Sequence, residues 1–297
     1  MARRRIADVS SQTVLSEIFM RNKNTMHILG TTLITCVLFF PLSACQTVKT
    51  TQGGAVGVDR QQRMSVSAQS IEQSANKQYG QLMAEANKKD KLNADTAQYE
   101  RVKKIADKLI KQTPSFRPDA LNWKWEVNVL TSGEVNAWCM PGGKIAVYSG
   151  LIEKLKITDD ELAAVMGHEI AHALREHSRE RASEQAVANV GISILATVAG
   201  LGQLGQKGME YAYQGLLGLP NSREHETEAD RIGVELAARA GYDPRAAITL
   251  WEKMGQVGGN EPPKFMSTHP PRADRVKDLT RYSQKVLPLF EQAKARG

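Results

Sequence analysis

Residues 168–172 read His-Glu-Ile-Ala-His, and this run predicts both the central helix of the fold and its chemistry. Two histidines four residues apart lie on one side of a helix, where they can bind one Zn²⁺ ion. The glutamate between them, Glu169, can then reach a water molecule on the metal. The run therefore predicts a zinc-dependent hydrolase, most simply a peptidase.

The neighbouring residues matter, because three fixed residues occur by chance in about one chain in a hundred. The alternative is an ordinary helix with His168 and His172 on a solvated face. In helical projection the two histidines lie opposite an apolar side, and Thr158 and Glu161 form a capping box at the start of the helix. This pattern favours a packed helix, whose apolar side consists of Leu162, Ala163, Met166, Ile170, Ala173 and Leu174.

A catalytic zinc ion usually has three protein ligands, so a third is required. Residues 222–240 project as a helix with one small, apolar face; Glu226 lies near the centre of that face and Asp230 beside it. Because an inward carboxylate without a partner is costly to bury, we predict Glu226 as the third ligand. Asp230 is predicted to accept the N–H of a ligating histidine. Glu224 and Glu228 fall on the polar face, and the alternative is a surface helix with a chance inward glutamate.

Four segments carry a family resemblance: 168–172, 226–230, 136–150 and 268–270, which together span most of residues 80–282. They resemble the gluzincin metallopeptidases that include the CAAX prenyl protease and the heat-shock protease HtpX. The resemblance implies an endopeptidase with one Zn²⁺ per chain, bound by His168, His172 and Glu226, and with Glu169 as general base. We expect a mainly helical α+β fold of the zincin type, with a small β-sheet beside the motif helix.

The same resemblance places His269, in Ser267-Thr-His-Pro-Pro271, near the site. The prolines restrict the backbone and could present the imidazole as a fixed side chain. His269 is a candidate catalytic residue that stabilises the tetrahedral oxyanion. It could instead occupy the open zinc position and hold the enzyme latent, or it could be an exposed loop residue. Arg272 or a tyrosine is an alternative oxyanion donor.

Alternating apolar residues predict a half-buried strand within residues 124–130 and another at 144–148. The link between them contains Asn136-Ala-Trp138 and a Pro141-Gly-Gly143 turn. In related zincins such an Asn-Ala-aromatic segment lies on an edge strand that pairs with the extended substrate. By resemblance, Asn136 and Ala137 are therefore candidate substrate-binding residues, and an ordinary hairpin loop is the alternative.

Two further histidines are not predicted as ligands. His177 lies on the apolar side of the motif helix, which is typical of a packed or capping residue, and His225 lies off the inward stripe. The glycine-rich apolar segment 186–217 is expected to pack against the catalytic helices, with a membrane-contacting hairpin or a lid as alternatives. Further helices are predicted at residues 68–89, 97–112, 244–256 and 271–285.

The N-terminal region resembles a bacterial lipoprotein signal, because an apolar stretch at 28–41 ends in Leu42-Ser-Ala-Cys45. We expect residues 1–44 to be a signal peptide and Cys45 to be lipidated. Residues 45–70 are predicted as a flexible tether and 71–297 as the metallopeptidase domain. A retained transmembrane helix is less favoured by so short a segment.

The residue after the lipidated cysteine is glutamine, which by the same resemblance predicts the periplasmic side of the outer membrane. Translation from Met20 instead of Met1 would give a signal of ordinary length. Without residues 1–44 the net charge falls from +7 to +4, with 34 basic and 30 acidic side chains, and no basic patch indicates nucleic-acid binding. Cys139 is then the one cysteine beyond Cys45, which excludes a disulfide within the mature chain, and no base is paired with it for nucleophilic catalysis.

These observations predict a lipid-anchored periplasmic zinc endopeptidase that degrades unfolded or misassembled envelope proteins. Its expected partners are those substrates, the membrane through the lipid anchor, and as a further candidate the outer-membrane assembly machinery. One rival hypothesis is a periplasmic chaperone or assembly factor with a latent or structural zinc site. Another is a zinc amidase that acts on cell-wall peptides.

Overall fold

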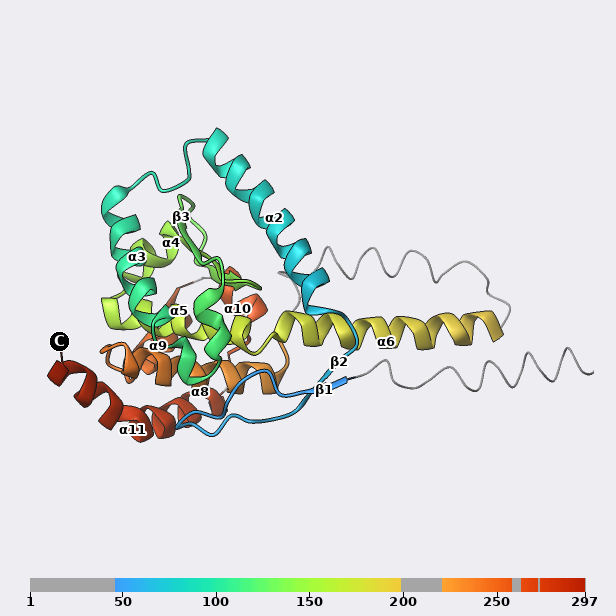
Figure 1. The fold of residues 1–297 in the computed structure, drawn as a ribbon. Helices are drawn as coiled ribbons and strands as arrows, with labels where there is room; N and C mark the ends of the chain where they lie inside the picture. Colours follow the sequence, from blue (N-terminus) through green and yellow to red (C-terminus); the bar gives the residue numbers. More distant parts are fainter. Residues whose placement is uncertain (1–45, 199–220, 258–262, 272, 297) are drawn as a thin grey trace, which may run out of the picture. The chain divides into compact units, whose positions relative to one another are not determined.

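The motif helix lies at the centre of the fold. The computed structural model describes residues 46–198, 221–257, 263–271 and 273–296. Helix α5 (Asp159–Leu174) begins with the predicted capping box, in which the Thr158 hydroxyl accepts the backbone N–H of Glu161 and the Glu161 carboxylate accepts that of Thr158. Every residue from Glu161 to Leu174 is buried, because α5 packs against α3 (Thr96–Ile110), α8 (Arg223–Arg239), α9 (Ala246–Gln256) and the sheet (Figure 1).

Two glycines allow α5 and α8 (Arg223–Arg239) to approach closely. A Cβ atom on Gly167 would lie 2.8 Å from the carbonyl oxygen of Gly233, and one on Gly233 would lie 2.8 Å from the backbone nitrogen of His168. Neither position therefore has room for a side chain. Since Gly233 follows Glu226 by about two helical turns on the same face, this contact brings the inward side of α8 to the motif histidines.

A three-stranded sheet packs against α5 through β4 (Ala137–Met140). β5 (Lys144–Tyr148) is the central strand, parallel to β3 (Glu126–Leu130) and antiparallel to β4. The predicted Pro-Gly-Gly turn joins β4 to β5, and both of its glycines have positive φ. The predicted alternation of β5 is wrong: residues 144–147 are all buried, because a central strand is covered on both faces.

Residues 46–66 do not form the flexible tether that their composition predicts. β1 (Gln46–Val48) pairs antiparallel with β2 (Gln62–Met64), and β2 contacts α6 (His177–Val198). Between the two strands, Val56 is buried and its backbone N–H donates to the carboxylate of Glu235 in α8. The local pattern is polar and aperiodic because the partners of this segment lie far away in the sequence.

The helices predicted at 68–89, 97–112, 244–256 and 271–285 are present with shifted ends, whereas those at Ser149–Leu155, His177–Val198 and Lys264–Thr268 were not predicted. α11 continues through Pro288 to Arg296, beyond the predicted end at residue 285. The predicted fold class, mainly helical α+β with a small sheet beside the motif helix, is confirmed. The other helices are α2 (Ala68–Lys88), α3 (Thr96–Ile110), α4 (Ser149–Leu155), α6 (His177–Val198), α9 (Ala246–Gln256), α10 (Lys264–Thr268) and α11 (Ala273–Arg296), with 3₁₀ turns at Thr113–Ser115 and Pro118–Asn122.

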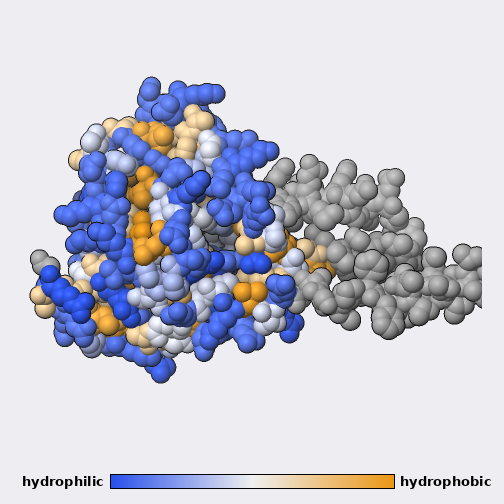
Figure 2. Space-filling model, in the orientation of Figure 1, coloured by the Kyte–Doolittle hydropathy of each residue, from blue (hydrophilic) through white to orange (hydrophobic). Residues whose placement is uncertain are grey.

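Several predictions concern residues outside the described ranges. The signal peptide at 1–44, the lipidated Cys45, residues 199–217 of the glycine-rich segment and Arg272 all lie there. Within the described residues, no helix is both long and apolar enough to cross a membrane. The face drawn in Figure 2 is mostly hydrophilic, with hydrophobic residues in narrow stretches, as expected where most apolar side chains belong to an internal core.

Candidate metal centre

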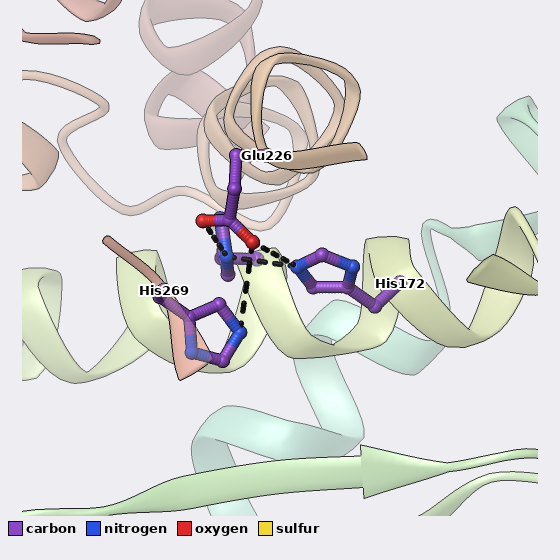
Figure 3. A group of neighbouring side chains, drawn as sticks. His172, Glu226 and His269 are labelled. Carbon is purple, nitrogen blue, oxygen red and sulfur yellow. Dashed lines mark hydrogen bonds and ion pairs between the residues drawn. The ribbon is translucent and has the colours of Figure 1, made fainter. Parts of the chain in front are cut away.

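Four side chains from three helical segments converge on one buried point. His168 and His172 come from α5, Glu226 from α8 and His269 from the C-terminal end of α10. Each offers one donor atom, and these four atoms all lie within 4.8 Å of one another. Figure 3 shows the Glu226 carboxylate directed from α8 toward the imidazoles of His172 and His269.

The spacing of these atoms fits a zinc ion. Ligand atoms bound at zinc's usual distances in a tetrahedral site are about 3.3 Å apart. Here Nε2 of His168 and Nε2 of His172 are 3.0 Å apart, and His172 Nε2 lies 3.3 Å from Glu226 Oε1. His168 Nε2 lies 3.6 Å from Glu226 Oε2. Glu226 Oε1 is buried and accepts no hydrogen bond from any described residue, as expected of an atom that binds a cation.

Asp230 lies where the sequence places it, one turn beyond Glu226. Its Oδ1 is 3.0 Å from Nδ1 of His168, which leaves Nε2 of that imidazole directed at the other ligands. Burial alone would raise the pKa of Asp230, but the charge of Arg275 and the hydrogen bond with His168 hold that pKa well below its ordinary value. A charged Asp230 fixes the proton of His168 on Nδ1 and frees Nε2 for a metal.

Arg275 of α11 is a buried residue of this site that the sequence analysis missed. Its Nε and Nη2 donate to Asp230 at 2.8 and 2.7 Å, and its Nη1 is 2.6 Å from Oε2 of Glu226. The guanidinium also stacks on Trp251, 3.9 Å from the ring centroid. Two inward carboxylates on one helix face do indicate a buried cation in addition to a metal, but no local pattern selects this arginine.

Glu169 lies beside the donors and is 4 % exposed. Burial raises the pKa of Glu169 to about 8. Its Oε1 lies 3.5 Å from Nε2 of His269 and accepts no hydrogen bond from a described residue. A carboxylate with a raised pKa can both take up and release a proton near neutral pH.

The backbone around His269 determines which of its nitrogens carries the proton. Nδ1 is 3.1 Å from the carbonyl oxygen of Phe265, which can only accept, and 2.9 Å from Oγ1 of Thr268, whose hydroxyl donates to the same carbonyl. A proton on Nδ1 satisfies both contacts and leaves a free lone pair on Nε2. The ring stacks on Phe265, with centroids 4.3 Å apart. Nε2 lies 3.9 Å from Oε1 of Glu226. A neutral His269 in this tautomer can bind a metal but cannot donate a hydrogen bond from Nε2 to an oxyanion.

A second buried polar cluster corrects the helical projection of α8. Glu228 and His225, both predicted to lie off the inward face, are only 6 % and 2 % exposed. Nε2 of His225 is 3.0 Å from Glu180 of α6, and Nε2 of His177 is 3.0 Å from Glu228. The projection failed because this polar face of α8 is covered by α6 and the N-terminal segment instead of by water.

A cleft opens onto the centre. Asn136 and Ala137, the predicted substrate-binding residues, line it together with Glu169, His172 and His269. Asn136 is half-buried and Ala137 is 2 % exposed; Ala137 begins β4, which is an edge strand of its sheet. Cys139 also lines the cleft, but it is buried and burial raises the pKa of its thiol well above the ordinary value, which disfavours a nucleophilic role.

Comparison with known proteins gives a match over most of the described domain. The family model of peptidase family M48 matches residues 96–283. The chain is 40 % identical over 174 residues to the mitochondrial metalloendopeptidase OMA1 of Arabidopsis thaliana, an alignment that covers 58 % of this chain and 34 % of the relative. It is 34 % identical over 216 residues to mitochondrial OMA1 of Bos taurus, covering 69 % and 41 % respectively.

A bacterial relative is more distant. The beta-barrel assembly-enhancing protease of Escherichia coli is 27 % identical over 177 residues, covering 56 % of this chain and 36 % of the relative. The chain thus spans 34–41 % of the length of these three curated relatives. The matches support the family level of the predicted resemblance but not its narrower assignment to the HtpX and CAAX prenyl protease type or to bacterial lipoproteins.

The predicted location on the periplasmic side of the outer membrane is wrong. Five relatives, from a plant, two fungi and two mammals, are mitochondrial metalloendopeptidases, and their identities of 32–41 % exceed the 28 % and 27 % of the two Escherichia coli proteins. The error arose because the location was inferred from residues 28–46 alone, whereas the similarity resides in the catalytic domain.

Proposed function

We propose that this chain, which belongs to peptidase family M48, is a zinc-dependent endopeptidase. The observation that carries the proposal is the convergence of His168, His172 and Glu226: the two Nε2 atoms are 3.0 Å apart, and each lies 3.3–3.6 Å from the nearer carboxylate oxygen of Glu226. Family M48 peptidases are zinc-dependent, and these three residues are the ligands that we propose for one Zn²⁺ per chain. When bound, zinc lowers the pKa of a water molecule and polarises the substrate carbonyl.

Glu169 is the general base in this proposal. Its carboxylate faces the same cleft as the donor atoms, so it can take a proton from the attacking water. It can then transfer that proton to the leaving amine. One side chain thus serves as base and then as acid.

His269 is the reversible fourth ligand of the resting enzyme in this proposal. Of the two roles that the sequence leaves open, the tautomer set by Phe265 favours metal binding over oxyanion stabilisation. His269 occupies the side of the ligand cluster that faces the cleft, where a substrate carbonyl would have to enter. Peptide cleavage then requires His269 to move away.

We propose unfolded or misassembled proteins as the substrate class. The cleft is bordered by an edge strand, β4, and an edge strand can pair with an extended backbone. Such pairing needs a chain without secondary structure of its own.

The function is tested by cleavage of unfolded casein by the full-length chain. We expect Glu169→Gln to lower kcat/KM by about 100- to 10,000-fold while zinc content stays unchanged, since the base does not bind the metal. A chelator should abolish cleavage by the wild type, and added zinc should restore it. If zinc-loaded wild type and zinc-loaded His269→Ala both bind casein but neither cleaves it, the protein is a chaperone instead.

A further inference from the structure

The two motif histidines differ in what contacts the nitrogen that faces away from the ligand cluster. Nδ1 of His168 meets a carboxylate directly, 3.0 Å from Asp230. Nδ1 of His172 instead lies 2.8 Å from Nδ1 of a second imidazole, that of His177 at the start of α6. His177 is fully buried. A histidine therefore stands where a ligating histidine usually has a carboxylate, carbonyl or water.

Only one arrangement of protons satisfies both rings when they are neutral. If Nε2 of His172 supplies a lone pair to a metal, its one proton is on Nδ1 and is donated to Nδ1 of His177. His177 must then carry its own proton on Nε2, which lies 3.0 Å from Oε2 of Glu228. The Glu228 carboxylate accepts this hydrogen bond. The hydrogen bonds therefore run from His172 to His177 and from His177 to Glu228.

Glu228 is held in place from the other side by two guanidinium groups. Arg175, at the end of α5, places Nε and Nη2 each 2.9 Å from Oε2 of Glu228. Arg60, in the N-terminal segment, donates from Nε to Oε1 at 2.7 Å. The arrangement of arginines around Glu228 resembles that on the opposite side of the centre, where Arg275 donates to Asp230. Each ligating histidine is thus connected to a carboxylate that is anchored by arginine.

A second metal site is the other explanation of this cluster, because His177, Glu180 and His225 have donor atoms within 4.8 Å of one another. The charges argue against it. Glu180 already receives both Nη atoms of Arg60, at 2.6 and 2.9 Å, and the side-chain amide of Gln62. A cation would have to displace these donors, whereas the hydrogen-bond chain from His172 to Glu228 leaves them in place.

We propose that His177, backed by Glu228, is a positioning residue that fixes the tautomer and orientation of the zinc ligand His172. This deepens the proposed function and rests on it. His177 does not touch the metal or the substrate in this arrangement. Its effect is on how well Nε2 of His172 is presented to zinc.

The test is zinc affinity, measured by competition with a chromophoric chelator on the full-length chain. His177→Phe keeps a ring on His225 but removes the acceptor for His172, so we expect affinity to fall by about 10- to 100-fold. His177→Asn should recover most of the affinity, because its carbonyl oxygen can accept the same N–H.

The matched control is His225→Phe: His225 is equally buried and stacks on His177 with centroids 4.3 Å apart, yet no contact joins it to His172. The zinc affinity of His225→Phe should equal that of the wild type.

The outcomes separate this inference from the proposed function. Wild-type protein that binds no zinc would refute the proposed function and this inference with it. Wild type that binds tightly, together with folded His177→Phe of equal affinity, would overturn the positioning role alone. Equal losses in His177→Phe and His225→Phe would also overturn it, since they would indicate general disturbance of the cluster.

A measurement on the wild type covers the case in which His177→Phe does not fold. Nitrogen-15 NMR of histidine-labelled, zinc-loaded protein identifies the protonated nitrogen of each imidazole. We expect a proton on Nδ1 of His172 and on Nε2 of His177. A proton on Nδ1 of His177, or metal bound through Nδ1 of His172, would contradict the proposal.

Discussion

His269 can be assigned a role by removing its side chain. Alanine there deletes the fourth donor and leaves the three proposed ligands, so zinc should stay bound while the position next to the cleft opens. We expect His269→Ala to raise kcat/KM for unfolded casein with zinc still at one ion per chain. The measurement is a steady-state assay combined with metal analysis of the same sample.

The opposite result has a definite meaning. A fall in kcat/KM with zinc retained would show that His269 assists the transition state, as the first of the two sequence-based alternatives holds. The tautomer set by the Phe265 carbonyl would then have to change during the reaction.

At the residue scale, the helical projection identified Glu226 and Asp230 as inward residues of α8 because apolar neighbours surround them. The same projection misplaced Glu228, since it finds a polar face but cannot show whether water or other protein groups cover that face. Arg60, which pairs with Glu228, comes from a different part of the chain. Arg275 was missed for the same reason, because it lies in α11, far in the sequence from Glu226 and Asp230.

Gly233 tests the contact between elements that the site depends on. A Cβ there would lie 2.8 Å from the backbone nitrogen of His168, so Gly233→Ala must push α8 away from α5. We expect a loss of about 1–3 kcal/mol in the free energy of unfolding and weaker zinc binding. Gly80→Ala is the control, because Gly80 is an exposed residue of α2 whose Cβ would meet nothing within 4 Å. A helix-interior alanine there should stabilise by up to about 1 kcal/mol. Wild-type zinc affinity in Gly233→Ala would contradict the account.

Glu161 makes the start of α5 sensitive to pH. Burial alone would raise the pKa of Glu161, but hydrogen bonds from Lys253, from the Thr158 backbone and from Thr249 hold that pKa below its ordinary value. A carboxyl with a lowered folded-state pKa stabilises the fold above its unfolded pKa, and this contribution is lost as pH falls through the folded value. Glu161→Gln should therefore unfold more easily than wild type at pH 7, by about 1 kcal/mol. The difference in free energy of unfolding between wild type and Glu161→Gln should shrink in acid, as measured by urea unfolding. A difference that stays the same at every pH would contradict this prediction.

At the element scale, α4, α6 and α10 were not predicted, whereas the other helices were, because their period and caps are local. Thr158 and Glu161 alone mark the start of α5. Residues 46–66 were mistaken for a tether because their stabilising contacts are with α6 and α8. The all-buried β5 was mistaken for a half-buried strand because its second face is covered by elements distant in sequence.

At the scale of the whole molecule, the centre joins α5, α8 and the end of α10 through His168, His172, Glu226 and His269. A ligand that binds only the folded chain stabilises it in proportion to the logarithm of its concentration over Kd. Zinc should therefore raise the unfolding temperature as well as enable cleavage.

Zinc stoichiometry tests the central claim most directly, in full-length wild type, Glu226→Ala and Glu224→Ala. Glu224 belongs to the same helical turn of α8 but its side chain is 62 % exposed, so it controls for loss of an acidic residue at this helix end. The account predicts one zinc ion per chain in wild type and in Glu224→Ala, and none in folded Glu226→Ala. Tightly bound zinc in Glu226→Ala, or none in the wild type, would contradict it.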